Sequence, residues 1–366
     1  MSLLASATAC LLTLPTFACV NTSYSLSDER EITNDLRLLV IGAFPHHGPA
    51  FYEKEVERCE QFLEKDAENF AARNDLGAAF TKLGRFDEGE SEFLRNNELH
   101  PGRYRTASNL GVLYKKWGKF ELSAEWLERA LSIRPGGHMG LGDYYLKMVR
   151  WREQFENVTE PPTNFLGIRY DDGADATSLV ARKRYIVTLI KNDMAFADAY
   201  FVLGDISFVE EDYSTAIRCY LRGQDLGNKS ATCTQRIHDV LEERPELFDG
   251  HYDFGNGSPA PESILREFAA ARAWLAEYRA LEARRLAESK SVDFASMSPI
   301  AAAMIDSPVI TERTFETYST HYSEPGWQST LQLVLLGLAV LIVIRLIAMG
   351  VQEIINRVKR FQHAEC

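Results

Sequence analysis

The stretch NLGVLYKKWGKFELSAEWLERALSIRP, residues 109–135, decides the fold. On both sides of Gly118 its apolar residues recur three and four positions apart, which predicts two short amphipathic helices. Glycine adopts positive φ without a steric penalty, so the chain can reverse direction at Gly118. Pro135 ends the second helix because it has no N–H to donate to the preceding turn. We therefore expect a helix hairpin.

The same pattern occurs 34 positions earlier in the chain. A fixed period of this length is typical of a protein built from stacked structural repeats. The matching positions of the first copy are Leu76-Gly77, Phe80, Gly84, Phe86, Phe93 and Pro101, and those of the second are Leu110-Gly111, Tyr114, Gly118, Phe120, Leu127 and Pro135.

This pattern resembles the tetratricopeptide repeat, in which helix A carries Leu-Gly and an aromatic residue and a glycine turn leads to helix B. A third, degenerate copy has Leu203-Gly204, with Glu211 at the turn glycine and Asn228 at the closing proline. The resemblance implies an all-α solenoid over residues 19–243. Its repeats are expected at about 70–103, 104–137 and 197–230. Half repeats flank them, and an insertion at about 156–174 is expected to lie irregularly at the solenoid edge.

Tetratricopeptide arrays bind extended peptides or helices in the groove lined by helix A, so the resemblance also implies a set of partner-binding positions. In the first two repeats these positions form a basic groove in an acidic protein, which favours an acidic or carboxylate-terminated partner segment. The alternative is that Lys82, Lys115 and Lys116 are ordinary solvated charges. The implied positions are Asn74, Ala78, Lys82, Arg105, Ser108, Val112, Lys115, Lys116, Asp198, Phe201, Asp205 and Phe208.

Composition excludes some classes of protein. The 366 residues are 46% hydrophobic and 25% charged, which is ample for a packed core. A formal net charge of −12 removes the general attraction to phosphate backbones, so we expect no nucleic-acid partner. Cys59, Cys219 and Cys233 are expected to be small buried residues without a disulfide framework.

Both ends of the chain predict a membrane location. Residues 1–18 have the length and the small terminal residues of a signal peptide, and lipidation of Cys19 is the alternative. Residues 329–351 are long and apolar enough to span a bilayer. The basic, amphipathic tail at 352–366 places the C-terminus in the cytoplasm and the repeats on the extracytoplasmic or periplasmic side.

Two further segments lie between the repeats and the membrane span. Residues 261–290 predict one long helix with a single apolar stripe, which either caps the solenoid or packs against another copy of the chain. Residues 291–328 are rich in Ser, Thr and Pro and are interpreted as a stalk.

The residues most like a chemical site are His46 and His47, ahead of Glu53 and Glu57. No metal-ligand or nucleophile spacing accompanies them, so we expect no catalytic residue, no metal and no cofactor. Proline and histidine stand just ahead of a Tyr-bearing helix, and these repeats follow it. This order resembles uncharacterised bacterial membrane-anchored proteins, and the resemblance does not indicate any particular activity. The leading hypothesis is a noncatalytic interaction scaffold. The alternatives are a metal-binding enzyme or assembly factor using the His46/His47 region, and a structural homo-oligomer.

Overall fold

The computed structural model describes residues 36–43, 45–137, 140–170, 176–247, 261–292 and 296–297. These residues contain thirteen α-helices, and their only β pairing is an isolated bridge between Thr163 and Arg169. The all-α class is therefore confirmed for the described part of the chain. The predicted signal peptide, membrane span and basic tail lie outside the described residues, as does nearly all of the predicted stalk.

Three antiparallel helix pairs form the repeats, and each begins with the helix that carries Leu-Gly. The glycine of that helix allows the close approach of its partner: a Cβ built on Gly111 would lie 2.7 Å from Leu127 Cγ, and one on Gly204 would lie 2.5 Å from Tyr220 Cε1. Any larger residue there would collide with the second helix. The pairs are α4 (Phe70–Lys82) with α5 (Phe86–Leu99), α6 (Tyr104–Lys116) with α7 (Phe120–Ile133), and α11 (Ala197–Val209) with α12 (Tyr213–Asp225).

The turn inside each pair uses a left-handed backbone conformation. Gly84 and Gly118 have φ of 76° and 77°, and Glu211 occupies the equivalent place in the third pair with φ of 60°. The structure thus confirms that all three turns are equivalent, and it shows that Glu211 adopts a conformation that favours glycine.

Further helices extend the stack on both sides of these pairs. Helix α3 (Pro49–Lys65) packs on α4, α10 (Lys183–Asn192) on α11, and α13 (Ala231–Glu243) on α12. Helix α8 (Gly142–Phe155) packs on α7. The glycine-rich stretch at residues 134–145, taken as sequence alone, favours a linker instead. From Gly142 onward that sequence is helical, and Tyr145, Met148 and Val149 are buried on the helix. The short helices α9 (Ala176–Val180) and η2 (Pro245–Leu247) complete the stack.

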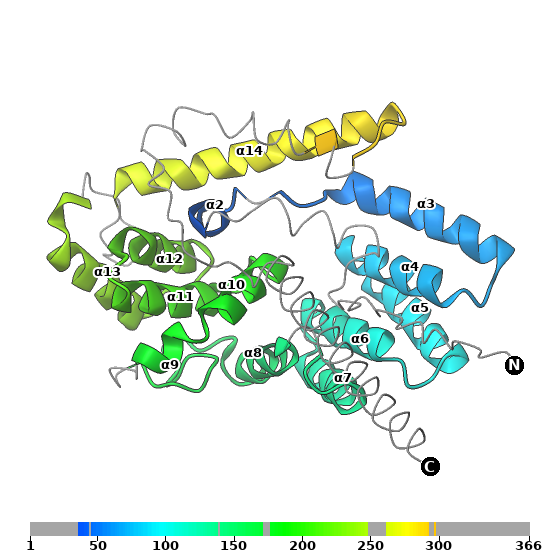
Figure 1. The fold of residues 1–366 in the computed structure, drawn as a ribbon, viewed down its shortest axis with the longest axis horizontal. Helices are drawn as coiled ribbons and strands as arrows, with labels where there is room; N and C mark the ends of the chain where they lie inside the picture. The colour runs from blue at the N-terminus through cyan, green and yellow to red at the C-terminus, as the bar shows by residue number, and fades with distance from the viewer. Residues whose placement is uncertain are drawn as a thin grey trace, which may run out of the picture. The chain divides into compact units, whose positions relative to one another are not determined.

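The long helix α14 (Glu262–Ala287) covers apolar surface at both ends of the array. It runs beside the short N-terminal helix α2 (Leu36–Ile41) and reaches α3 (Figure 1). Its Glu267 accepts hydrogen bonds from Arg218 of α12 at 2.8 and 2.9 Å and from Arg37 of α2 at 2.8 Å. Its apolar stripe is buried within the chain, through Ile264, Phe268, Ala271, Trp274 and Tyr278. In the described structure α14 acts as a cap.

Replacement of Glu211 by glycine is expected to raise the free energy of unfolding by about 0.5–1 kcal/mol, because glycine removes the penalty of a left-handed conformation. Chemical denaturation measures the change. Glu211→Ala is the matched control: it removes the same side chain but keeps the penalty, so its stability should stay near that of the wild type. Equal stabilisation by both substitutions would contradict the explanation.

Candidate interaction surface

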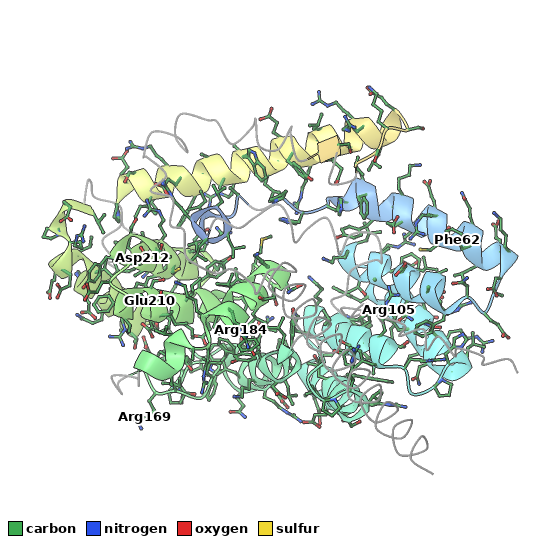
Figure 2. The ribbon with its side chains drawn as sticks, in the orientation of Figure 1. Phe62, Arg105, Arg169, Arg184, Glu210 and Asp212 are labelled. Carbon is green, nitrogen blue, oxygen red and sulfur yellow. The ribbon has the colours of Figure 1, made fainter. Side chains whose placement is uncertain are left out.

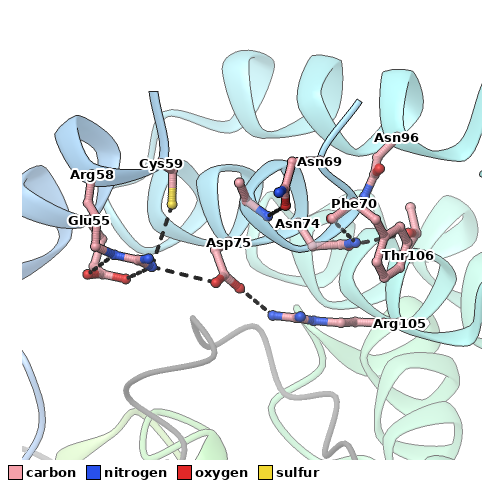
Figure 3. A network of polar contacts seen from close by, with 11 residues as sticks. Glu55, Arg58, Cys59, Asn69, Phe70, Asn74, Asp75, Asn96, Arg105 and Thr106 are labelled. Atoms are coloured by element: carbon pink, nitrogen blue, oxygen red, sulfur yellow. Dashed lines mark hydrogen bonds and ion pairs between the residues drawn. The ribbon is translucent and has the colours of Figure 1, made fainter. Parts of the chain in front are cut away.

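Helices α4 and α6 are the first helices of consecutive pairs, and a row of charged groups crosses them from α3. Arg58 donates to both carboxylate oxygens of Glu55, at 2.9 and 2.8 Å. Its guanidinium also lies 3.6 Å from a carboxylate oxygen of Asp75, and Asp75 accepts a hydrogen bond from Arg105 of α6 (Figure 3). We call Glu55, Arg58, Asp75 and Arg105 the polar row.

The polar row is partly open to solvent and electrostatically balanced. The Arg58 side chain is 40% exposed and that of Arg105 is 19% exposed, whereas Asp75 is buried. The hydrogen bond to Glu55 outweighs desolvation and raises the pKa of Arg58, so its charge is permanent. Desolvation raises the pKa of the neighbouring Cys59 thiol to about 12, which keeps that thiol neutral. The row is therefore a fixed array of alternating charges.

Beside this row, neutral polar groups join the same two helices. Asn74 and Asn96 both donate to the carbonyl of Phe70 at 3.1 Å, and Thr106 donates to Asn74 at 3.3 Å (Figure 3). Asn74 and Thr106 are fully buried. Asn74 thus holds the repeats together, and its side chain is not accessible from outside.

Lys115 of α6 is buried in an ion pair. Its ammonium donates to Asp193, in the loop before α11, at 2.6 Å, and lies 5.2 Å from the ring centre of Tyr145. Burial alone would raise the pKa of Asp193, but the charge and hydrogen bond of Lys115 outweigh it and lower that pKa. Lys115 therefore connects the second repeat to the third, while the adjacent Lys116 is exposed.

On the third repeat, the first helix meets a loop of the same chain. Asp198 of α11 accepts hydrogen bonds from the Phe165 N–H and the Tyr170 hydroxyl, both at 2.7 Å. The Tyr170 ring meets Phe201 edge to face, with centroids 5.0 Å apart. The insertion was expected at the solenoid edge. Within it, Asn164, Phe165 and Leu166 are buried, and Phe165 and Leu166 pack among α11 and its neighbours. Arg169, labelled in Figure 2, marks this loop.

The structure distributes the implied partner-binding positions unevenly. The positions on α4 and α6 are joined by the polar contacts between these two helices. The positions on α11 lie under or beside the loop at residues 163–170. Lys116 is exposed, while Lys82, Arg105, Asp205 and Phe208 are half-buried. The other positions of the set are buried: Asn74, Ala78, Ser108, Val112, Lys115, Asp198 and Phe201.

His46 and His47 contact the long helix α14. His47 Nδ1 lies 2.5 Å from a carboxylate oxygen of Glu282, whose second oxygen accepts from the Gly48 N–H at 2.8 Å. Arg279 lies within hydrogen-bonding distance of His46. Among the described residues, no group of three His, Cys, Asp or Glu side chains is placed to hold a metal ion.

Sequence reasoning did not find the carboxylate partners of the basic residues. Asp75 and Asp193 carry no motif, and Asp193 lies 78 positions from Lys115. Asp75 directly follows Asn74 on α4, so its position on the helix could have shown that it lies next to an implied partner-binding position. The contact of Tyr170 with α11 had no such signal, because the insertion falls outside the repeat period.

These pairs define an α-helical repeat protein with short antiparallel helices. Residues 104–136, which are α6, α7 and the turns around them, match the family model described as tetratricopeptide repeat. The chain therefore carries a tetratricopeptide repeat at residues 104–136, and repeats of this family typically serve protein–protein interaction. The comparison with curated proteins gives no match. Within the described ranges, no helix combines the length and the apolar character needed to span a bilayer.

The buried Asp198 predicts a specific pH dependence of stability. Desolvation raises its pKa to about 7 despite the hydrogen bonds from Tyr170 and Phe165. Between about pH 4 and pH 7 the folded state then holds a proton that the unfolded state has released, so stability falls as pH rises. Relative to Asp198→Asn, the wild type should lose up to about 1.4 kcal/mol per pH unit in this interval. Denaturation of both proteins across the interval measures it, and a pH-independent difference would refute the assignment.

Proposed function

We propose that the protein is a noncatalytic scaffold that binds a segment of a partner protein along α4 and α6. The polar row is the observation that carries this proposal. It holds charged groups of the three helices α3, α4 and α6 at fixed distances, and Arg58 and Arg105 are still partly accessible. A preorganised array of this kind recognises a partner without first losing side-chain freedom.

An acidic or carboxylate-terminated partner segment fits this surface through a small number of cations. Lys115 is neutralised by Asp193, and Arg105 by Asp75. Lys116 is exposed, and Lys82 is half-buried over the Tyr52 ring at 5.6 Å. Because their side chains are more accessible than that of Lys115, the attraction is expected at Lys82 and Lys116, at the C-terminal ends of α4 and α6.

We further propose that residues 329–351 anchor the scaffold in a membrane, with the repeats on the extracytoplasmic or periplasmic side and the C-terminus in the cytoplasm. The support is in the sequence: an apolar segment of spanning length is followed by a basic tail. Assembly into a homo-oligomer has less support, because the apolar stripe of α14 is buried within its own chain.

Binding is tested by selection of peptides from a random library on the full-length protein. We expect enrichment of acidic or carboxylate-terminated peptides, and about five- to tenfold weaker binding of a selected peptide to Lys82→Glu/Lys116→Glu. Lys115 is left unchanged, since a glutamate there would face the carboxylate of Asp193. The control is Lys54→Glu/Lys229→Glu, which makes the same charge change at two exposed sites on other elements. Equal affinity for all three proteins would refute the assigned surface.

Anchoring is tested by sedimentation of membranes from cells that produce the protein. The full chain is expected in the membrane fraction, and a chain ending at residue 328 in the supernatant, because the apolar segment supplies the anchor. A chain that lacks only residues 352–366 should still sediment. If the chain ending at 328 sediments and Cys19→Ser releases it, a lipid is the anchor and the spanning helix is refuted.

A further inference from the structure

The loop at residues 163–170 contacts the third repeat as a bound peptide contacts a receptor. One carboxylate, Asp198, accepts both a backbone N–H and an aromatic hydroxyl from the loop, each at 2.7 Å. Arg236 of α13 donates to the backbone carbonyl of Tyr170 at 3.3 Å. The Tyr170 ring meets Phe201 edge to face. Backbone hydrogen bonds combined with an aromatic anchor are the usual means of recognising a short segment.

The residues that receive the loop occupy positions that the resemblance to tetratricopeptide repeats assigns to partner binding. Asp198 and Phe201 lie on α11, the first helix of the third pair, and the repeat pattern places both toward the ligand groove. Asp205, one turn beyond Phe201 on the same helix, accepts from Tyr220 at 2.8 Å and from Arg236 at 3.1 Å. It thereby orients the guanidinium that reaches the loop. The loop thus covers a surface that the repeat architecture otherwise leaves for a partner.

The loop maintains its own shape. Asn164 accepts through its side chain from the Leu166 and Ile168 N–H groups, at 3.0 and 3.1 Å, and its own N–H donates to the Ile168 carbonyl at 2.9 Å. Gly167 has φ of 78°, and a Cβ built there would meet nothing within 4 Å. The turn is therefore formed by local hydrogen bonds and one glycine conformation, and it places Phe165 and Tyr170 on the same carboxylate.

We propose that Asp198 and Phe201 of α11, with Arg236 of α13, form a second peptide-binding site, which residues 163–170 occupy in cis. The external ligand of this site is a short segment with a tyrosine and without acidic residues, because the site presents the carboxylates of Asp198 and Asp205. Such a ligand binds only when it displaces the loop. A tethered segment competes at an effective concentration in the millimolar range, so the site is closed to weak ligands.

The probe for this proposal is the loop itself, as a labelled synthetic peptide of residues 163–170, TNFLGIRY. Three full-length proteins are compared by fluorescence anisotropy: the wild type, Gly167→Ala, and a variant in which residues 164–170 are replaced by glycine and serine at equal length. The Gly167→Ala change strains the turn without touching the receiving face, so it raises the population of the open loop.

The replaced-loop variant is expected to bind the peptide saturably, and the wild type at least tenfold more weakly. Gly167→Ala should gain about tenfold over the wild type, because apparent affinity scales with the fraction of open loop. Within the replaced-loop variant, Asp198→Asn should weaken binding, and the matched exposed Asp143→Asn should leave it unchanged. A peptide with phenylalanine in place of the tyrosine should bind about fivefold more weakly, since the hydroxyl bond to Asp198 is lost.

Absence of saturable binding at millimolar peptide to a folded replaced-loop variant would overturn the proposal, and the loop would be an integral part of the core. If that variant does not fold, Gly167→Ala decides the question through hydrogen exchange of the Phe165 amide. Faster exchange together with a gain in peptide affinity supports the second site, and faster exchange without any gain refutes it. Because no external partner is used, either outcome leaves the proposed surface on α4 and α6 unaffected.

Discussion

A helix pair of this kind has apolar side chains on two sides, and its neighbour in the stack covers only one of them. In the described structure α3 covers the first pair and α13 the third, and helix α14 packs beside α2 and α3. Helix α14 buries Ile264, Phe268 and Trp274, each worth about 2 kcal/mol in transfer free energy. Two buried carboxylates fix its position, Glu267 to α12 and α2, and Glu282 to the residues before α3. The repeats between these contacts are held in a defined stack, which in turn fixes the polar groups on their first helices.

A second constraint explains why charged residues among the implied binding positions have partners within the chain. A charged group that becomes buried by packing needs a partner, and leaving it unpaired is strongly destabilising. Lys115 meets this need through Asp193, Arg105 through Asp75, and Asp198 through Tyr170 and the Phe165 amide. The same interactions that complete the fold therefore remove charge from the predicted groove. The surface that can bind a ligand is therefore smaller than a uniformly basic groove. It consists of the polar row with Lys82 and Lys116, and of the face of α11 that the loop at residues 163–170 covers.

The repeat architecture was predictable because its signals are local. Gly77, Gly111 and Gly204 mark close helix approach, and the structure shows that a Cβ at each would lie within 3.0 Å of the partner helix. The third pair was recognised without a turn glycine, and its Glu211 adopts a left-handed φ of 60°, close to the φ of Gly84 and Gly118. Helix α8 was not predicted, because the glycines before it favour a linker. The path of the insertion could not be inferred, because the insertion and the helices that it contacts are not related by the 34-residue repeat.

The sequence by itself determined the class of fold and the residues at which helices must approach or reverse, because these depend on side-chain size and backbone freedom within about 34 residues. Only the tertiary structure decided which charged side chains are buried in ion pairs and which are exposed to solvent. Whether a lysine on a helix faces a ligand or a buried aspartate depends on a residue such as Asp193, 78 positions away, and on how the stack brings the two together. Pairing of buried charges is a property of the packed chain, and no short stretch of sequence contains it.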